Sequence, residues 1–258
     1  MSATIKTPTG REISFETGLF INNEFRPAKG NNSFTTPDPS TGEILATVSA
    51  ATTEDVDDAV KAARKAFETT WGRHSTPSQR SSALFKWADL IEENIELLAE
   101  LESLDNGKPV WMARDVDIVD SANCLRYYAG LADKIEGRTI EQQEGVKIAF
   151  TRLEAIGVCG QIIPWNYPIQ MFAWKVGAAL AAGNTIVIKP AEQTPLSALI
   201  LAKLAKQAGF PPGVVNVING LGSVAGVAIS KHMDIDKVAF TGSTFTGRKI
   251  MEAAPEQP

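Results

Sequence analysis

Two places in this chain put polar side chains directly after an apolar, β-branched run, where they could carry chemistry. The first place holds Trp165 and Asn166, and the second holds Lys189 and Glu192. Asn166 is a neutral amide donor of the type that stabilises an oxyanion, and its alternative role is an Asx turn before Pro168. Lys189 could contact a ribose or a phosphate, or simply be solvated. Glu192 could accept both hydroxyls of a ribose, and its charge would repel a 2′-phosphate.

The elements around these side chains form one predicted supersecondary unit. The runs at 156–163 and 184–189 are rich in Val and Ile, and the Ala-rich segment 171–182 between them has a length typical of a helix. Strand, helix and strand in this order predict a parallel βαβ crossover. Because open α/β sheets bind ligands beyond the carboxyl ends of their strands, the polar side chains lie where a ligand is expected.

The same alternation continues toward the end of the chain. Strands are predicted at about 156–163, 184–189, 214–218 and 236–241, and helices at about 168–182, 194–208, 222–231 and 244–253. This repetition predicts an α/β fold with a doubly wound parallel sheet. Residues 254–258 are predicted to be a frayed tail.

The N-terminal half has a different pattern, in which short strands precede a set of helices. Residues 1–18 are predicted to be disordered, and 19–25 to form a hairpin with Asn22 and Asn23 in its turn. Helices are predicted after Thr53, from Pro77 to Asn106 and over 115–135. Residues 146–153 alternate with period two, which favours an antiparallel arm over a buried strand.

Two glycine-containing turns could contact an anion. Thr241, Gly242 and Ser243 follow a predicted strand and open a helix, so their backbone N–H groups could bind a phosphate. The alternative for that turn is a helix N-cap beside a flexible glycine. The loop 219–226 has glycines at 220, 222 and 226, which miss the G-x-G-x-x-G spacing of a dinucleotide-binding loop.

Composition argues against several classes of partner. The net charge is −5 and no block of Lys and Arg occurs, so neither nucleic acid nor an anionic membrane is expected as a partner. No apolar run is long enough for a membrane span and no secretory signal is recognised, so a cytoplasmic location is expected. His74 and His232 stand alone in the sequence and are expected at the surface, so no metal site is predicted.

The two cysteines, Cys124 and Cys159, are expected to be structural. Cys124 lies within a predicted helix and Cys159 lies inside an apolar strand. Thiols in apolar surroundings keep a high pKa and are poor nucleophiles. Two cysteines also cannot form a disulfide framework, which favours a reducing compartment.

Four segments of the chain carry a resemblance to a known family. They read Gly-Val-Cys-Gly-Gln-Ile-Ile-Pro-Trp-Asn-Tyr-Pro, Lys-Pro-Ala-Glu-Gln-Thr-Pro-Leu-Ser-Ala, Gly-Phe-Pro-Pro-Gly-Val-Val-Asn-Val and Phe-Thr-Gly-Ser-Thr. Together they resemble the NAD(P)-dependent aldehyde dehydrogenase superfamily. The resemblance implies the family's Rossmann-like NAD-binding domain over 19–253. It also implies that residues 138–155 form a hairpin arm through which subunits associate, as a homo-oligomer or with a full-length relative.

The resemblance further implies roles for individual residues. Asn166 matches the family's oxyanion amide, and Lys189 and Glu192 match its contacts to the adenosine ribose. The walls and the phosphate turn of the cofactor groove are matched by Ile162, Ile163, Pro164, Trp165, Gly222, Gly226, Phe240, Gly242 and Ser243. The expected cofactor is NAD, because the charge of Glu192 disfavours NADP, and the expected substrate is a small-molecule aldehyde.

The sequence departs from the family pattern in one respect. Family members continue into a Glu-Leu-Gly-Gly segment with the general base and a later Gly-Gln-x-Cys segment with the nucleophile, and neither occurs here. The chain is therefore expected to be a truncated family member, a pseudoenzyme that does not oxidise aldehydes alone. Two alternatives stay open: a repurposed enzyme with non-redox chemistry on a small molecule, and a non-catalytic partner of a full-length relative.

Overall fold

A six-stranded sheet forms the centre of the molecule in the computed structural model, which describes residues 1–142, 145 and 147–253. The strand order is β12-β9-β10-β11-β3-β4. These strands are β3 (Leu19–Ile21), β4 (Glu24–Arg26), β9 (Val158–Ile162), β10 (Thr185–Lys189), β11 (Val215–Val217) and β12 (Lys237–Phe240). The four strands β12, β9, β10 and β11 are parallel, which confirms the prediction, and the β3–β4 hairpin adds two antiparallel strands.

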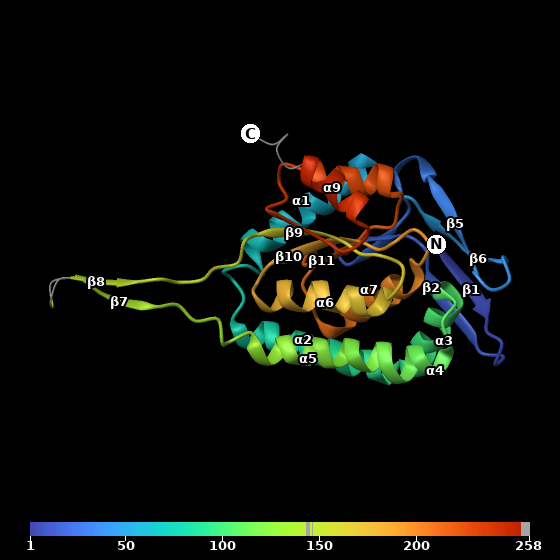
Figure 1. The fold of residues 1–258 in the computed structure, drawn as a ribbon, viewed down its shortest axis with the longest axis horizontal. Coiled ribbons are helices and arrows are strands. Elements are labelled where there is room, and N and C mark those ends of the chain that lie inside the picture. Colours follow the sequence, from blue (N-terminus) through green and yellow to red (C-terminus); the bar gives the residue numbers. More distant parts are fainter. Residues whose placement is uncertain (143–144, 146, 254–258) are drawn as a thin grey trace.

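Helices cover both faces of this sheet, as expected for a doubly wound fold (Figure 1). On one face lie α1 (Thr53–Thr69), α8 (Val227–Lys231) and α9 (Thr244–Ala253). On the other face lie α6 (Pro168–Ala181) and α7 (Leu196–Ala208). Outside α6 and α7 a further layer contains α2 (Pro77–Glu93), α3 (Ile95–Asn106) and α5 (Val119–Leu131).

The core explains why the central strands are apolar runs without alternation. Strands β9, β10 and β11 are buried along their whole length because helices cover both of their faces. Trp87 of α2 anchors the outer helix layer against α6 and α7. Its ring packs edge-on against Phe172 and Phe210, and its Nε1 donates to the carbonyl of Leu201 at 3.2 Å.

Residues 1–18 are ordered, so the prediction of a disordered N-terminus is wrong. Strands β1 (Ser2–Lys6) and β2 (Glu12–Glu16) form an antiparallel hairpin, and a second hairpin follows from β5 (Ser33–Pro37) and β6 (Ile44–Ser49). A short 3-10 helix, η1 (Lys29–Asn31), lies between them in sequence. Ile13 and Phe15 are buried in the main core, and this apolar anchoring orders the segment.

The helix predicted from Pro77 to Asn106 is two helices, α2 and α3. The chain leaves helical geometry at Asn94 (φ −105°, ψ 19°), whose side-chain amide donates back to the carbonyl of Leu90 at 2.8 Å. Asn side chains compete for backbone groups in this way and favour helix ends. The predicted end at Asn106 is confirmed, and the next residue, Gly107, ends the helix with a left-handed φ of 85°. After it come α4 (Val110–Met112) and the π-helix η2 (Ala113–Ile118), which lead into α5.

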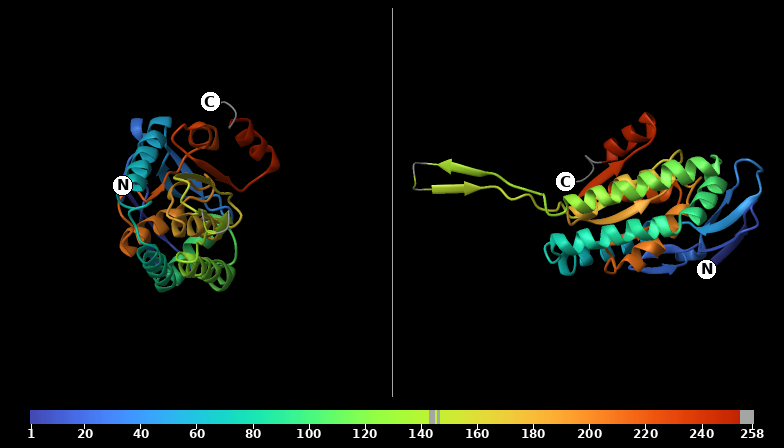
Figure 2. Two further views of the ribbon diagram at one scale, coloured as in Figure 1. Left: turned by 90° about the vertical axis from the view of Figure 1, so that its left-hand side faces the viewer. Right: turned by 90° about the horizontal axis from the view of Figure 1, so that it is seen from below.

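A two-stranded arm projects from the body between α5 and β9 (Figures 1 and 2). Its strands are β7 (Thr139–Gln142) and β8 (Lys147–Phe150), paired antiparallel as predicted. Ile148 and Phe150 are 79% and 76% exposed, so the arm leaves apolar side chains uncovered. Val146, within the predicted alternation, and the predicted tail at 254–258 lie outside the described residues.

None of the helices formed by the described residues is both long enough and apolar enough to cross a membrane.

Candidate functional site

Ile162, the last residue of β9, lies at the centre of the sheet's carboxyl edge. It is in register with Lys189 on β10 and with Phe240 on β12. From β9 the chain turns to α6 on one face, whereas from β12 it turns to α9 on the other face (Figure 1). Neighbouring connections that diverge in this way make a topological switch point, where open α/β sheets form ligand crevices. Residues from three separate segments are thus brought to one edge.

Lys189 and Glu192 form an ion pair at this edge. Nζ of Lys189 donates to Oε2 of Glu192 at 3.0 Å and to the carbonyl of Pro190 at 3.0 Å. Burial lowers the pKa of Lys189, which is 2% exposed, although the charge of Glu192 acts in the other direction. Burial acts to raise the pKa of Glu192, but Lys189 and the N–H of Gly222 hold it below its usual value. The carboxylate is therefore ionised at neutral pH and oriented by a buried ammonium.

Gly222 and Gly226 lie against this ion pair. They begin and end the π-helix η3 (Gly222–Gly226), which leads into α8. A Cβ on Gly222 would lie 3.9 Å from Oε1 of Glu192, and a Cβ on Gly226 would lie 3.9 Å from Cδ of Lys189. The loop whose glycine spacing misses the dinucleotide pattern therefore still brings its backbone to the predicted ribose-binding side chains.

A cavity of about 400 Å³ opens beside η3, between α8 and α9. Three of the predicted residues, Ile162, Gly222 and Gly226, line it. Val227 of α8 and Ile250 of α9 also line it and were not singled out from the sequence. The available signal was the amphipathic pattern of these two helices, which does not say what the apolar side faces.

Phe240, Gly242 and Ser243 form a tight turn between β12 and α9. A Cβ on Gly242 would lie 2.5 Å from Cζ of Phe240, so only glycine allows the ring to fold back under the turn. Oγ of Ser243 accepts a hydrogen bond from the backbone N–H of Thr246 at 3.2 Å. The N-cap alternative for Ser243 is thus present. The N–H of Thr241 donates to the carbonyl of Ile162 at 3.1 Å, whereas those of Gly242 and Ser243 have no partner among the described residues and are available to a ligand.

The loop with Asn166 lies beside Ile162 along the chain, at the start of α6. Ile163 is buried and its N–H donates to the carbonyl of Lys189 at 3.2 Å, whereas Pro164 is half-buried and Trp165 is exposed. The side chain of Asn166 is exposed and has no hydrogen-bond partner within the described residues. An Asx turn would need the N–H of residue 168, which is a proline and has none. The Asn166 amide is therefore available to a ligand.

Two residues that the sequence reasoning missed hold this loop from the end of α3. Nδ2 of Asn106 donates to the carbonyl of Trp165 at 2.7 Å, and Nζ of Lys108 lies 3.4 Å from the carbonyl of Asn166. The Lys108 ammonium also lies 4.5 Å from the centre of the Tyr167 ring. A helix-ending Asn-Gly followed by Lys-Pro looks like an ordinary stop signal, so no local pattern indicates this role.

A buried acidic network lies directly beneath the same loop. Lys108 forms an ion pair with Asp117 and lies 4.0 Å from Glu102, and both carboxylates are fully buried. Burial raises the pKa of Glu102 to about 7, although Lys108 and the N–H of Ile169 act against it. Burial also raises the pKa of Asp105, whose Oδ2 accepts from the first N–H of α7 at 2.8 Å. Helix α3 therefore caps the N-termini of both crossover helices with buried carboxyl groups.

Neither cysteine is placed or activated as a nucleophile. Cys159 is 3% exposed within β9 and Cys124 is partly buried on α5. Burial raises the pKa of each thiol to about 11. Within residues 1–142, 145 and 147–253, no group of three or more His, Cys, Asp or Glu is arranged to hold a metal ion. His74 is exposed as expected, whereas His232 is partly buried with its Nε2 3.4 Å from Oδ1 of Asp57.

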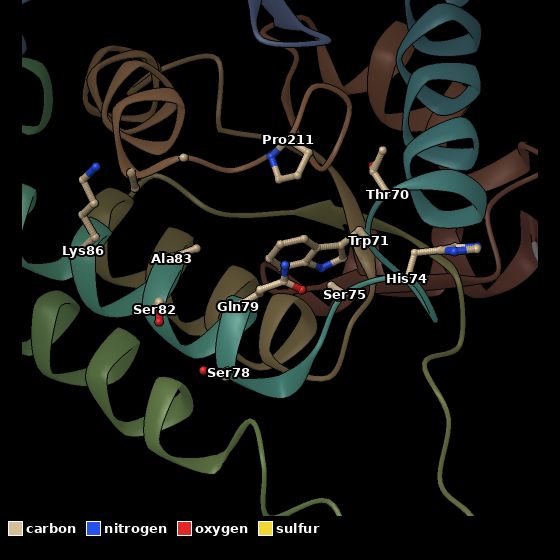
Figure 3. A pocket seen from close by; sticks show the side chains of 12 residues that line it. Thr70, Trp71, His74, Ser75, Ser78, Gln79, Ser82, Ala83, Lys86 and Pro211 are labelled. Atoms are coloured by element: carbon tan, nitrogen blue, oxygen red, sulfur yellow. The ribbon is translucent and has the colours of Figure 1, made fainter.

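A separate hollow lies away from this edge, between the end of α1, the first turns of α2 and the chain after α7 (Figure 3). Trp71 forms its floor, and His74, Gln79 and Lys86 stand at its rim. None of the residues predicted to bind a cofactor or to act in catalysis lines it. The oxygen of the Gln79 side chain accepts from the backbone N–H of Thr76 at 2.8 Å, which gives that residue a capping role. The carboxyl edge is therefore the better candidate site.

Comparison with known proteins identifies the family of the chain. The model of the aldehyde dehydrogenase family matches residues 25–257. An aldehyde dehydrogenase of Alternaria alternata is 55% identical over 253 residues, which are 98% of this chain and 50% of that protein. A human mitochondrial aldehyde dehydrogenase is 52% identical over 252 residues, which are 97% of this chain and 48% of that protein. The chain thus spans about half the length of the curated relatives it matches.

Solved structures show the same similarity in three dimensions. The NAD+ complex of an aldehyde dehydrogenase from Bacillus cereus superposes with a TM-score of 0.91 and 55% identity, over 93% of this chain and 49% of that one. The aldehyde dehydrogenase KauB from Pseudomonas aeruginosa superposes with a TM-score of 0.92 and 39% identity, over 95% and 49% of the two chains.

Proposed function

Because this chain belongs to the aldehyde dehydrogenase family, we propose that it binds NAD at its carboxyl sheet edge and serves the oxidation of an aldehyde. The observation that carries the proposal is the register of Ile162 with Lys189 and Phe240 at the switch point. The similar Bacillus cereus structure, solved as an NAD+ complex, supports the choice of nucleotide. The domain with this role is proposed to span 19–253.

The residues at the edge fit a dinucleotide in chemistry and in space. The ionised carboxylate of Glu192 can accept from two ribose hydroxyls, and the buried Lys189 fixes its direction. The turn at Gly242 and Ser243 offers backbone N–H groups to a phosphate. The residues proposed to line the rest of the groove are Ile162, Ile163, Pro164, Trp165, Gly222, Gly226 and Phe240. Bound NAD supplies the hydride acceptor of the reaction.

Asn166 is proposed to stabilise an oxyanion. Its exposed, unpaired amide follows β9 directly, and loss of one such donor typically slows catalysis by about 10²–10³-fold. No other group of this chain is assigned to covalent chemistry. A thiolate is needed to capture an aldehyde, and the pKa of both cysteines is raised to about 11. We therefore propose that the described residues provide cofactor binding and oxyanion stabilisation without a nucleophile.

Calorimetric titration with NAD and with NADP tests the cofactor proposal. We expect NAD to bind more tightly than NADP. Glu192→Gln is expected to weaken NAD by about tenfold and to reduce the preference over NADP, since one charge-assisted contact is lost. Glu252→Gln removes an exposed carboxylate from α9 that does not line the cavity and is the matched control. Equal or tighter NADP binding by the native chain would refute the role of Glu192.

A second candidate function is association with another subunit through the arm. The observation that favours it is the exposure of Ile148 and Phe150 on a projecting hairpin. The partner would be a second copy or a full-length relative.

NADH formation from short aldehydes, measured with the chain alone and then with a full-length relative added, separates these functions. We expect no turnover by the chain alone. Turnover by the chain alone would contradict the proposal that it lacks a nucleophile. If the chain instead converted a small molecule without using NAD, that result would favour a repurposed enzyme.

A further inference from the structure

A third cavity lies at the root of the arm, at the opposite edge of the sheet from the nucleotide groove. Its volume is about 420 Å³. The walls come from the chain between α1 and α2, the first turn of α2, the end of α6 and residues 152–156, which lead from the arm into β9. Nothing in the proposed nucleotide site uses these residues.

A buried guanidinium without an acidic partner lines this cavity. Arg80 is 8% exposed. Its Nε donates to the carbonyl of Ala181 at 2.9 Å, and its Nη1 donates to the carbonyl and to Oγ of Ser75 at 2.8 and 3.1 Å. Burial lowers the pKa of Arg80, and no neighbouring acid group opposes this effect. Within the described part of the chain, no carboxylate compensates this charge.

The remaining nitrogen of Arg80 is the one that a ligand can reach. Nη2 has no hydrogen-bond partner among the described residues, and it keeps some accessible surface. The carbonyl of Ala181 belongs to the negatively polarised end of α6 and offsets part of the charge, but it binds only Nε. Arg80 lines the cavity, and a buried cation with an unbonded nitrogen is costly unless an anion pairs with it.

The charges around the cavity leave an excess of positive charge. Arg152 lines it and has no ion pair among the described residues. Arg73 also lines it, but its Nη2 lies 2.5 Å from Oε2 of Glu154. The other acidic lining residue, Asp133, pairs with a lysine next to it in sequence. Arg80 and Arg152 therefore remain without counter-charges.

We propose that this cavity binds a small oxyanion, with inorganic phosphate as the fitting ligand, between Nη2 of Arg80 and the side chain of Arg152. A guanidinium presents N–H groups in a planar fork that matches the oxygens of phosphate. A small ion fits better than a protein segment, because the reachable part of Arg80 lies inside a concave cavity. The ligand would join the body of the molecule to the root of the arm.

Titration of the full chain with phosphate at constant ionic strength tests this proposal. Saturable binding by calorimetry and a rise in melting temperature are expected, together with a shift of the Arg80 Nε–H resonance in an arginine-labelled NMR spectrum. Arg152→Gln is expected to weaken phosphate by about tenfold, since one charged contact is lost, and it should fold normally because Arg152 is exposed. Arg80→Lys keeps the charge but removes the fork, and is expected to weaken phosphate at least as much.

Arg138→Gln is the matched control, because Arg138 is an exposed arginine near the arm root that does not line the cavity. Its phosphate affinity should equal that of the native chain, and NAD binding should be the same in all variants. The proposal is overturned if phosphate does not saturate, or if Arg138→Gln weakens it as much as Arg152→Gln does. The proposal is also overturned if a carboxylate of a second copy of the chain fills the cavity. In that case the chain would form a dimer that Arg152→Gln abolishes and that phosphate does not affect.

Discussion

The side-chain amide of Asn106 donates a hydrogen bond to the backbone carbonyl of Trp165 at 2.7 Å, across 59 positions of sequence. The neighbouring Lys108 lies 3.4 Å from the next carbonyl, that of Asn166. The end of α3 thus holds the two peptide groups that precede the start of α6. In this way a helix outside the sheet orients the residue proposed to stabilise an oxyanion.

Removing the Asn106 amide is expected to loosen this loop without unfolding the protein. Asn106→Ala should lower the free energy of unfolding by about 1 kcal/mol, the usual value for one hydrogen bond. It should also speed hydrogen exchange at the amides of residues 166–170, measured by mass spectrometry. Asn123→Ala, which truncates an exposed amide on α5, is the control and should neither lower the free energy of unfolding nor speed exchange at residues 166–170. Unchanged exchange at the loop in Asn106→Ala would show that the contact does not hold it.

The raised pKa of Glu102 makes stability depend on pH. Its folded pKa of about 7 exceeds the ordinary value of 4.5, so between these limits the folded state keeps a proton that the unfolded chain has lost. The stabilisation is full below pH 4.5 and is lost as the pH rises through 7, and the shift corresponds to roughly 3 kcal/mol.

Glu102→Gln cannot titrate and is expected to flatten this dependence. Chemical denaturation between pH 4.5 and 8 measures it, with Glu96→Gln on the exposed side of α3 as the control that keeps the native slope. The pKa of Asp105 is also raised by burial, so a dependence of the same sign that comes from Asp105 remains in every variant. If the free energy of unfolding of Glu102→Gln changed with pH as it does in the native chain, the dependence could not be assigned to Glu102.

Both cysteines are expected to react slowly with iodoacetamide at pH 7. Their pKa of about 11 leaves little thiolate, and the rate should rise with pH toward that value. Single Cys124→Ser and Cys159→Ser variants assign the labelled site by mass spectrometry. Labelling in denaturant gives the rate of an ordinary thiol. If either cysteine of the folded chain reacted as fast at pH 7 as in denaturant, that thiol would be available for covalent chemistry.

The arm is expected to mediate association through its apolar side chains. Replacing Ile148 and Phe150 together by Ser should raise the dissociation constant of any oligomer by at least tenfold, because two exposed apolar groups no longer leave water on binding. Light scattering across a dilution series measures the mass. Lys147→Ser on the same strand is the control. A native chain that stays monomeric at high concentration, or a double variant that associates like the native chain, would exclude this role.

The parallel sheet and much of the candidate site could be predicted from the sequence because their signals are local. Apolar runs between helical patterns predict buried parallel strands, and residues that follow such runs must lie at one sheet edge. Asn166, Lys189 and Glu192 were found in this way. In the structure Lys189 ends β10, Glu192 follows it, and Asn166 lies between β9 and α6. The turn of the β3–β4 hairpin was also predictable, since Asn22 and Asn23 tolerate their observed positive φ values of 56° and 63°.

Only the tertiary structure decided which distant segments meet. Ile13 and Phe15 alternate with polar residues, but this pattern does not show that they pack into the main core. Residues 1–18 were therefore wrongly predicted to be disordered. Asn106 and Arg80 look like helix-end and surface residues, because their partners lie 59 and 101 positions away. The pKa of Glu102 is likewise set by full burial beside Lys108. Desolvation and long-range hydrogen bonds depend on which distant segments pack together, and the periodicity of a single sequence does not identify those segments.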